Sequence, residues 1–131
     1  MSVRIIIADD HAVVREGIRR ILEARPEWEI CGEAENGQEA VRLAEELNPD
    51  AIIMDVSMPC MNGIEATREI ARRKANVPVL IFTMHESAHI AATANTVGAR
   101  GLVTKSDAIR DLIRALESVL SGGTFFLAQR E

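Results

Sequence analysis

Five polar side chains stand where short apolar runs of this sequence end. Asp9 and Asp10 follow the first run, Asp55 ends a run in the middle of the chain, and Thr83 and Lys105 end two later runs. If these runs are parallel strands, their carboxyl ends meet at one edge of the sheet, where open α/β sheets bind ligands. We therefore expect the five side chains to gather at one site.

The three carboxylates of this expected site suit a hard divalent cation. Like charges placed close together cannot all remain ionised without a cation. Oxygen ligands with room for water favour Mg²⁺ or Mn²⁺ over Zn²⁺. A metal there would neutralise an incoming phosphoryl group and align it for in-line attack by the Asp55 carboxylate. Lys105 would offer a positive charge to a phosphate oxygen, and the Thr83 hydroxyl would offer a hydrogen bond.

Each of these residues also has an ordinary structural explanation. Asp9 and Asp10 are good caps for a following helix, and Asp55 could simply begin a turn. Thr83 is a β-branched residue that suits a strand, and Lys105 could be solvated. Their joint occurrence at the ends of predicted strands on one edge favours a functional site.

Strand-like and helix-like patterns alternate five times along the chain. Apolar or alternating runs predict strands at residues 3–8, 28–34, 51–54, 79–83 and 101–104. Amphipathic runs predict helices at residues 12–24, 37–48, 62–73, 87–97 and 107–121. This alternation is typical of βαβ units, whose right-handed crossovers build a doubly wound parallel sheet between two layers of helices. The predicted fold class is therefore α/β.

Several helix boundaries can be predicted from local chemistry. Asn36 and Asn62 each precede a Gly and stand three residues before a Glu, which is the pattern of a capping box. Asp107 is expected to cap the last helix, whose apolar stripe begins at Ile109. The helix at 87–97 has few large apolar residues to bury, so we expect it to be the least stable.

Composition restricts the class of protein. The 131 residues carry a formal net charge of -5, which lacks the basic footprint of a nucleic-acid-binding domain. Cys31 and Cys60 have no metal-type spacing and are expected to be free thiols in a reducing cytosol. With no leader-like segment and no run long enough to span a membrane, a cytoplasmic protein is expected. His11 and His89 are expected to be ordinary surface residues.

Several motifs together resemble the receiver domain of two-component response regulators. They are ADDH at residues 8–11, MDVSMPCMNG at 54–63, Thr83, and Lys105 after GLVT. The segments IIADDHAVVREGI, GIEATREI and FTMHE are most similar to the NarL/FixJ (LuxR-type) subfamily. The resemblance covers nearly the whole chain. It implies a flavodoxin-like, five-stranded parallel sheet in the order 2-1-3-4-5.

The resemblance also implies a role for each site residue. Asp55 would accept a phosphoryl group from a sensor histidine kinase. Asp10 would bind Mg²⁺ (or Mn²⁺) directly, Asp9 would act largely through water, and the backbone carbonyl of Ser57 would complete the metal site. Such a domain is a signalling phosphoacceptor and, at most, catalyses its own phosphotransfer and dephosphorylation.

The remaining residues carried over from the resemblance concern the phosphoryl group itself. Thr83 and Lys105 would bind its oxygens. Ser57 and His85 lie two residues beyond Asp55 and Thr83, at positions that tend to set the rate of dephosphorylation in the family.

The sequence departs from the family pattern in two places. An aromatic residue usually stands three residues before the lysine and takes part in the output switch, whereas this chain has Leu102. The second departure is the missing effector domain, because the subfamily normally continues into a helix-turn-helix domain.

We therefore expect residues 1–121 to be the receiver and residues 122–131 to begin a linker to an effector domain that this chain does not contain. Transcriptional output and DNA contact would belong to that domain, and a homodimer on phosphorylation is a possible further partner.

Three other classes of protein share part of this pattern. A phosphohydrolase with an aspartyl nucleophile usually has a DxD motif after the first strand, where this chain has Asp9-Asp10. A flavin-binding module would need a loop rich in Ser, Thr and Gly there instead. A receiver-like interaction scaffold that is never phosphorylated stays open because of Leu102. A natural single-domain receiver stays open as the alternative to a receiver whose effector domain has been removed after Glu131.

Overall fold

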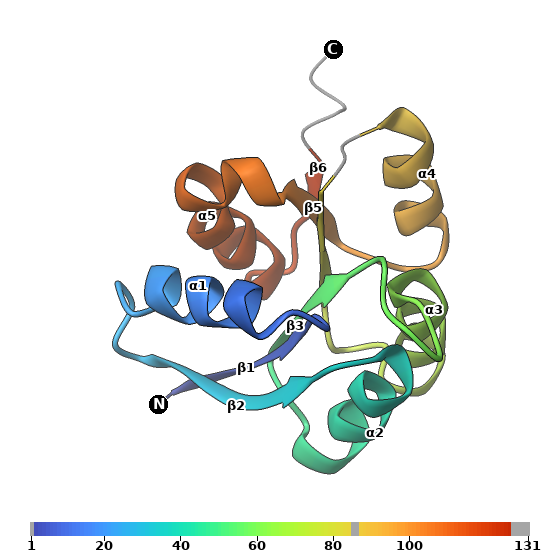
Figure 1. Cartoon of the computed structure of the whole chain (residues 1–131), viewed down its shortest axis with the longest axis horizontal. Coiled ribbons are helices and arrows are strands. Elements are labelled where there is room, and N and C mark those ends of the chain that lie inside the picture. Colours follow the sequence, from blue (N-terminus) through green and yellow to red (C-terminus); the bar gives the residue numbers. More distant parts are fainter. Residues whose placement is uncertain (1, 85–86, 127–131) are drawn as a thin grey trace.

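A computed structural model describes residues 2–84 and 87–126 (Figure 1). The elements, in chain order, are β1 (Val3–Ala8), α1 (Ala12–Leu22), β2 (Trp28–Ala34), α2 (Gly37–Leu47), β3 (Ala51–Asp55), α3 (Gly63–Arg73), β4 (Val79–Thr83), α4 (Ala88–Thr96), β5 (Gly101–Thr104), the 3₁₀ turn η1 (Lys105–Asp107), α5 (Ala108–Leu120) and β6 (Phe125–Phe126). The strands form one sheet in the order β2-β1-β3-β4-β5-β6, and every pair is parallel. The predicted α/β class and the order of its five strands are confirmed.

The sixth strand corrects the five-stranded expectation. Phe125 pairs with Gly101 and Phe126 pairs with Leu102, so β6 extends the sheet beyond β5. A β-carbon at Gly101 would lie 2.9 Å from the carbonyl oxygen of Phe125, so the absent side chain permits this close approach. Two residues are too few to show an alternating pattern, and the strand could not be predicted from periodicity.

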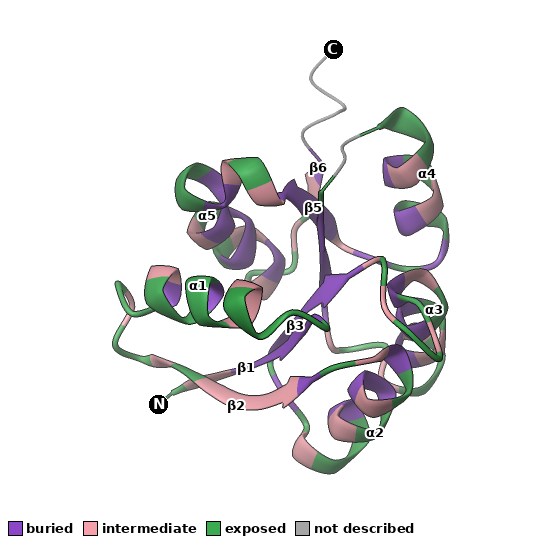
Figure 2. Cartoon of the chain, in the orientation of Figure 1, coloured by how far each residue is buried: buried purple, intermediate pink, exposed green. Residues whose placement is uncertain are grey.

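The helices cover both faces of the sheet and bury its central strands. In Figure 1, α1 and α5 lie on one face, and α2, α3 and α4 lie on the other. Ile5 and Ile7 of β1 pack in the core on the face covered by α1 and α5. Ile6 and Ala8 pack in the core on the opposite face, which α2, α3 and α4 cover. Figure 2 shows β1, β3, β4 and β5 as largely buried. The central strands are therefore apolar on both faces, as expected for a parallel sheet.

The two predicted asparagine caps are present. The side chain of Asn36 accepts a hydrogen bond from the backbone N–H of Glu39 at 2.8 Å, and Asn62 accepts one from Glu65 at 2.9 Å. The Glu39 carboxylate in turn accepts from the backbone N–H of Glu35 at 2.8 Å. Each cap satisfies an amide that the first turn of the helix leaves without a partner.

Two expectations about the last helix were wrong. Asp107 precedes α5 but makes no capping hydrogen bond, because its carboxylate accepts one from the Thr104 hydroxyl at 3.0 Å. Ile109 is 87 % exposed. The buried stripe begins one residue earlier, at the small residue Ala108, and continues through Leu112, so the helix is rotated away from the orientation that Ile109 would have required.

The predicted helix at 87–97 forms with slightly shorter bounds. Ser87 caps α4 by accepting a hydrogen bond from the backbone N–H of Ile90 at 3.0 Å, and the helix buries Ala91 and Ala94. Its low stability stays a prediction. None of the helices in the described part of the chain combines the length and apolar character that a membrane crossing requires.

Candidate functional site

The acidic residues after β1 and β3 lie together at the carboxyl edge of the sheet. Ala8 of β1 pairs with Met54 of β3, so the residues that follow them are neighbours. Asp9, Asp10 and Asp55 each offer a carboxylate oxygen within a group of atoms that all lie within 4.8 Å of one another. Asp9 and Asp55 are buried, whereas Asp10 is exposed. The three carboxylates that the sequence suggested would converge are brought together.

Lys105 points into this acidic group from the end of β5. Its Nζ lies 2.9 Å from Oδ2 of Asp9 and 3.4 Å from Oδ1 of Asp55, and its side chain is 13 % exposed. The ammonium also lies 5.9 Å from the centre of the Phe82 ring. One lysine thus offsets part of the charge of two buried carboxylates. Its flexible side chain allows the ammonium to turn toward another anion.

The carboxylate of Asp9 still has unused capacity. Its Oδ2 is buried and has no hydrogen-bond partner of acceptable geometry, although Lys105 Nζ is at ion-pair distance. A buried oxygen of this kind is costly unless a further positive charge satisfies it. The donors available at this edge are carboxylate oxygens, which suit Mg²⁺ or Mn²⁺. The residues present therefore fit a hard divalent cation.

Burial makes Asp55 reluctant to ionise. Burial raises the pKa of the Asp55 carboxyl, and the nearby charge of Asp9 raises it further. The Lys105 ammonium and a hydrogen bond from the Ser57 backbone act in the opposite direction without cancelling the rise in pKa. That hydrogen bond also places Ser57, the expected carbonyl ligand, beside the Asp55 carboxylate. A cation at this edge would favour the ionised, nucleophilic form.

Thr83 lies at the same edge, at the end of β4. It pairs in register with Thr104, and the preceding residue, Phe82, pairs with Asp55. Its side chain is buried. Thr83, Lys105 and Asp55 therefore come from the ends of three adjacent strands. The expected role of His85 concerns a residue that lies outside the described part of the chain.

Two glycines hold the loop after β3 against the helices around it. The N–H of Gly63 donates to the carbonyl of Val56 at 2.8 Å, and a β-carbon there would lie 1.9 Å from the carbonyl oxygen of Asp55. The N–H of Gly37 donates to the carbonyl of Met61 at 2.9 Å, and a β-carbon would lie 2.2 Å from that oxygen. These close approaches require glycine and fix the backbone that carries Asp55.

Sequence reasoning missed two residues near the acidic group. His11, expected to be an ordinary surface residue, places Nδ1 at 3.1 Å from Oδ1 of Asp10 and 3.3 Å from Oδ1 of Asp9. Arg15 of α1 donates to the backbone carbonyl of Asp9 at 2.6 Å and to the carboxylate of Glu33 at 2.7 Å. The position of His11 directly after two acids was a usable signal. Nothing in the sequence pointed to Arg15.

Leu102 is buried beside α4. Its side chain is 2 % exposed and belongs to the same core cluster as Ala91 and Ala94 of α4. Phe126 of β6 pairs with it and joins this cluster. The residue that replaces the usual switch aromatic is thus enclosed between α4 and the sixth strand.

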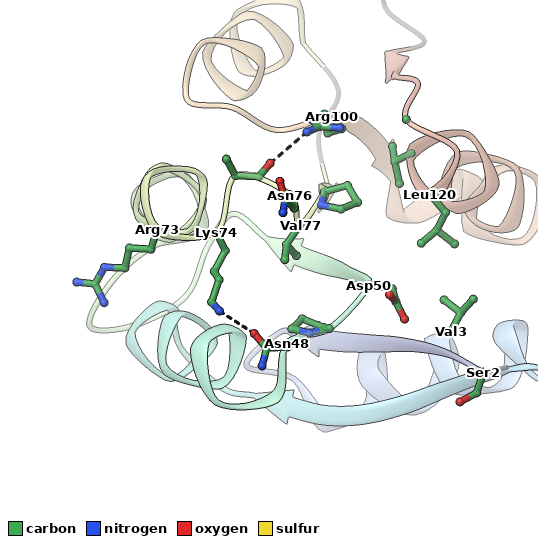
Figure 3. A pocket seen from close by; sticks show the side chains of 15 residues that line it. Ser2, Val3, Asn48, Asp50, Arg73, Lys74, Asn76, Val77, Arg100 and Leu120 are labelled. Carbon is green, nitrogen blue, oxygen red and sulfur yellow. Dashed lines mark hydrogen bonds between the residues drawn. The ribbon is translucent and has the colours of Figure 1, made fainter.

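A hollow of about 770 Å³ with a mixed polar and apolar lining lies at the opposite, amino edge of the sheet (Figure 3). Its cationic side chains already have partners, since Lys74 donates to Asn48 at 2.6 Å and Arg100 donates to the carbonyl of Ala75 at 3.3 Å. The hollow is separate from the acidic group and contains none of the five predicted site residues.

Comparison with known proteins identifies the class that this fold and site define. The sequence matches the response regulator receiver domain family over residues 5–117. It is 40 % identical over 124 residues to the transcriptional regulatory protein DegU of Brevibacillus brevis. The aligned residues cover 95 % of this chain and 52 % of DegU. The chain belongs to the family of response regulator receiver domains, and it spans about half the length of the curated relatives it matches.

Solved structures agree with this assignment. A two-component response regulator of the LuxR family from Aurantimonas sp. SI85-9A1 superposes with a TM-score of 0.91 at 42 % identity, covering 95 % of this chain and 89 % of that one. The isolated receiver domain of RcsB from Salmonella enterica serovar Typhimurium, solved with the phosphomimetic BeF₃⁻, superposes with a TM-score of 0.87 at 29 % identity, covering 96 % and 94 %. The resemblance to LuxR-type regulators is confirmed. Receiver domains are signalling phosphoacceptors that bind Mg²⁺ in an acidic pocket.

Proposed function

We propose that Asp55 accepts a single phosphoryl group from a sensor histidine kinase, in a reaction that requires Mg²⁺ or Mn²⁺. The observation that carries this proposal is the position of Asp55, buried at the end of β3 with Lys105 Nζ at 3.4 Å and the Asp9 and Asp10 carboxylates beside it. Membership of the receiver family and the match of the site to its motifs support the same role.

Asp10, Asp55 and the backbone carbonyl of Ser57 are the proposed direct ligands of the cation, and Asp9 is the proposed partner of a metal-bound water. When bound, the cation would neutralise charge on the phosphoryl oxygens. The unused capacity of Asp9 and the raised pKa of Asp55 both favour a positive charge here. The chain's own contribution is to hold these oxygens before the phosphoryl group arrives.

In the proposed transfer, an Asp55 carboxylate oxygen attacks the phosphorus atom of phosphohistidine. A P–O bond forms while the P–N bond breaks, and the imidazole of the kinase leaves with the electron pair. Lys105 would turn from Asp9 and Asp55 toward a phosphoryl oxygen, because the new acyl phosphate carries more negative charge than the carboxylate it replaces. The Thr83 hydroxyl would donate to another phosphoryl oxygen. Neither residue transfers a proton in this step. Because the phosphoryl group stays bound to Asp55 of the domain itself, we propose the domain as a phosphoacceptor rather than an enzyme with turnover.

The output of the switch is proposed from the relatives. DegU is a transcriptional regulatory protein, and this chain covers 52 % of it. We therefore propose residues 1–121 as the receiver unit and residues 122–131 as the start of a linker to a DNA-binding effector domain. Because Phe125 and Phe126 pair with β5, the start of this linker is joined directly to the sheet. DNA contact would belong to the effector domain, and phosphorylation would act in the cytoplasm, with dimer formation as a possible consequence.

Intact-mass measurement after incubation with Mg²⁺ and a small acyl-phosphate donor tests the proposal. We expect the mass of one phosphoryl group to be added, and the addition to disappear in Asp55→Asn or when EDTA replaces Mg²⁺. Asp50→Asn is the matched control, because Asp50 precedes the opposite end of β3 and binds the backbone N–H of Arg4 at 2.8 Å. Stoichiometric labelling of Asp55→Asn would refute the assignment. Absence of labelling in the wild-type protein would favour the unphosphorylated scaffold.

A further inference from the structure

His11 carries an imidazole, a side chain that often binds metals, and the proposed function gives it no role at this site. It stands directly after Asp9 and Asp10 and immediately before α1. Its side chain is 66 % exposed, and it makes no capping hydrogen bond to the helix. The ring is therefore held neither by packing nor by capping, but by its contacts with the carboxylates of Asp9 and Asp10.

The ring nitrogen of His11 lies among the acidic ligand atoms. Nδ1 is 3.1 Å from Oδ1 of Asp10 and 3.3 Å from Oδ1 of Asp9. The backbone N–H of His11 donates to the same Asp9 oxygen at 2.8 Å, which keeps the turn compact. A ring nitrogen of His11 is also one of the ligand atoms that lie within 4.8 Å of one another, together with an oxygen of Asp55.

These separations match those of neighbouring ligands on one cation. At ligand distances of about 2.1 Å, adjacent ligand atoms of an octahedral ion lie about 3.0 Å apart. The buried Asp9 Oδ2 has the Lys105 ammonium at 2.9 Å but no hydrogen-bond partner of acceptable geometry, and the same ammonium also faces Asp55, so two buried carboxylates share one lysine. A nitrogen and several carboxylate oxygens are thus placed where one ion could contact them.

A nitrogen ligand changes which cation the site prefers. Mg²⁺ is a hard ion that selects oxygen ligands, whereas first-row transition ions accept imidazole readily. A site with oxygen ligands alone discriminates weakly in favour of such ions. The same site with one imidazole nitrogen gains affinity for them and gains little for Mg²⁺.

We propose that Nδ1 of His11 is a direct ligand of the divalent cation and makes this receiver prefer a first-row transition ion, such as Mn²⁺, over Mg²⁺. The inference rests on the proposed function for the existence of the metal site. It goes beyond that function by adding a ligand and setting the identity of the ion. Phosphotransfer is not needed to test it, because ligation and affinity are measured on the unphosphorylated protein.

Pulsed electron paramagnetic resonance of the Mn²⁺-bound chain tests the ligand directly. We expect the spin echo to show modulation from a directly bound ¹⁴N nucleus. The chain has three histidines, so single replacement of each by alanine assigns the nitrogen. His11→Ala should abolish the modulation, while His85→Ala and His89→Ala should keep it. Because His11 is mostly exposed, His11→Ala should remain folded. The wild-type protein alone already shows whether a nitrogen is bound to the cation, and the variants only assign that nitrogen to a residue.

Calorimetric titration with Mn²⁺ and with Mg²⁺ tests the preference. His11→Ala should lower the ratio of Mn²⁺ to Mg²⁺ affinity by roughly tenfold or more, the scale of single changes around metal sites. Mn²⁺ binding without ¹⁴N modulation, or modulation that survives His11→Ala, would overturn the inference and leave the proposed function intact. If neither cation bound the wild-type chain, the metal requirement of the proposed function would fail together with the inference.

Discussion

The guanidinium of Arg15 donates a hydrogen bond to the backbone carbonyl of Asp9 at 2.6 Å. The same side chain donates to the Glu33 carboxylate at 2.7 Å and is 13 % exposed. Burial opposes ionisation of Glu33, but Arg15 and Arg19 together lower the pKa of this carboxyl. Arg15 therefore ties α1, the end of β1 and β2 together directly behind the acidic group, and acts as a positioning residue.

Arg15→Met should weaken the site without touching a phosphoryl group. We expect a loss of about 1–3 kcal/mol in the free energy of unfolding, since two hydrogen bonds involving a charged partner disappear. Mn²⁺ affinity should fall as well, because the Asp9 backbone loses its support. Chemical unfolding and calorimetry measure the two effects. Arg20→Met is the control, since Arg20 forms an ion pair with the exposed Glu16 on the same helix, and should change stability by less than about 0.5 kcal/mol. Unchanged metal affinity in Arg15→Met would show that Arg15 has no positioning role.

The Asp55 carboxyl should reduce stability in the absence of metal. Its pKa is raised in the folded protein, first by burial and then by the charge of Asp9. As the pH rises, the unfolded chain releases this proton before the folded chain does. Stability is therefore lost as the pH rises from the ordinary aspartate range through the raised pKa, and it stays lower above that value.

Asp55→Asn should accordingly be more stable than the wild-type protein at neutral pH in EDTA, by about 1 kcal/mol, the usual size of a single substitution. The difference should shrink when the pH is lowered to about 4, the ordinary aspartate range, because the wild-type carboxyl with its raised pKa takes up its proton as the pH falls toward that range. Saturating Mg²⁺ should stabilise the wild-type protein more than the variant. Urea unfolding at the two pH values measures these differences. A variant less stable than wild type at neutral pH in EDTA would contradict this account of Asp55.

Gly63→Ala should damage the loop that carries Asp55. The added β-carbon would meet the Asp55 carbonyl oxygen at 1.9 Å, so backbone must move. We expect a loss of at least about 3 kcal/mol, in the range of overpacking and backbone strain combined, and a lower labelling rate. Gly17→Ala is a matched control in the middle of α1, where nothing lies within 4 Å of the new carbon. That control should be more stable by about 0.5–1 kcal/mol. Thermal unfolding of both variants decides the comparison.

Activation should proceed through α4 while Leu102 stays buried. Moving a switch from 1:99 to 99:1 needs about 5.5 kcal/mol of differential binding, and one hydrogen bond from Thr83 to a charged group offers about 1.5–3 kcal/mol. Lys105 and the backbone after β4 must therefore contribute. Leu102 has no polar end that would draw it out of the core it shares with Ala91 of α4.

Nuclear magnetic resonance with and without a beryllofluoride phosphoryl mimic measures this switch. We expect large shifts of the amides of α4 and a Leu102 methyl environment that remains apolar in both states. Leu112, buried in the core on the other face of the sheet, serves as the reference methyl. Exposure of Leu102 in either state, with α4 unmoved, would contradict the proposed route.

Local sequence patterns were sufficient for the elements and for most of the acidic site. Strand bounds such as 79–83 follow from short runs of β-branched residues, and the caps at Asn36 and Asn62 depend on side chains three residues away along the chain. The convergence of Asp9 and Asp55 was predictable too, because both follow strands whose direction and neighbourhood are set by the parallel fold.

Contacts between distant segments decided what periodicity could not. The orientation of α5, with Ala108 inward and Ile109 outward, depends on how closely a helix can approach the sheet, which small residues determine. The pairing of Phe125 with Gly101, and the support that Arg15 offers Asp9, join residues far apart in the chain. The direction of the His11 ring is likewise a property of the turn that packs it beside two acids. Such relationships arise from packing in three dimensions, and a one-dimensional pattern carries no record of them.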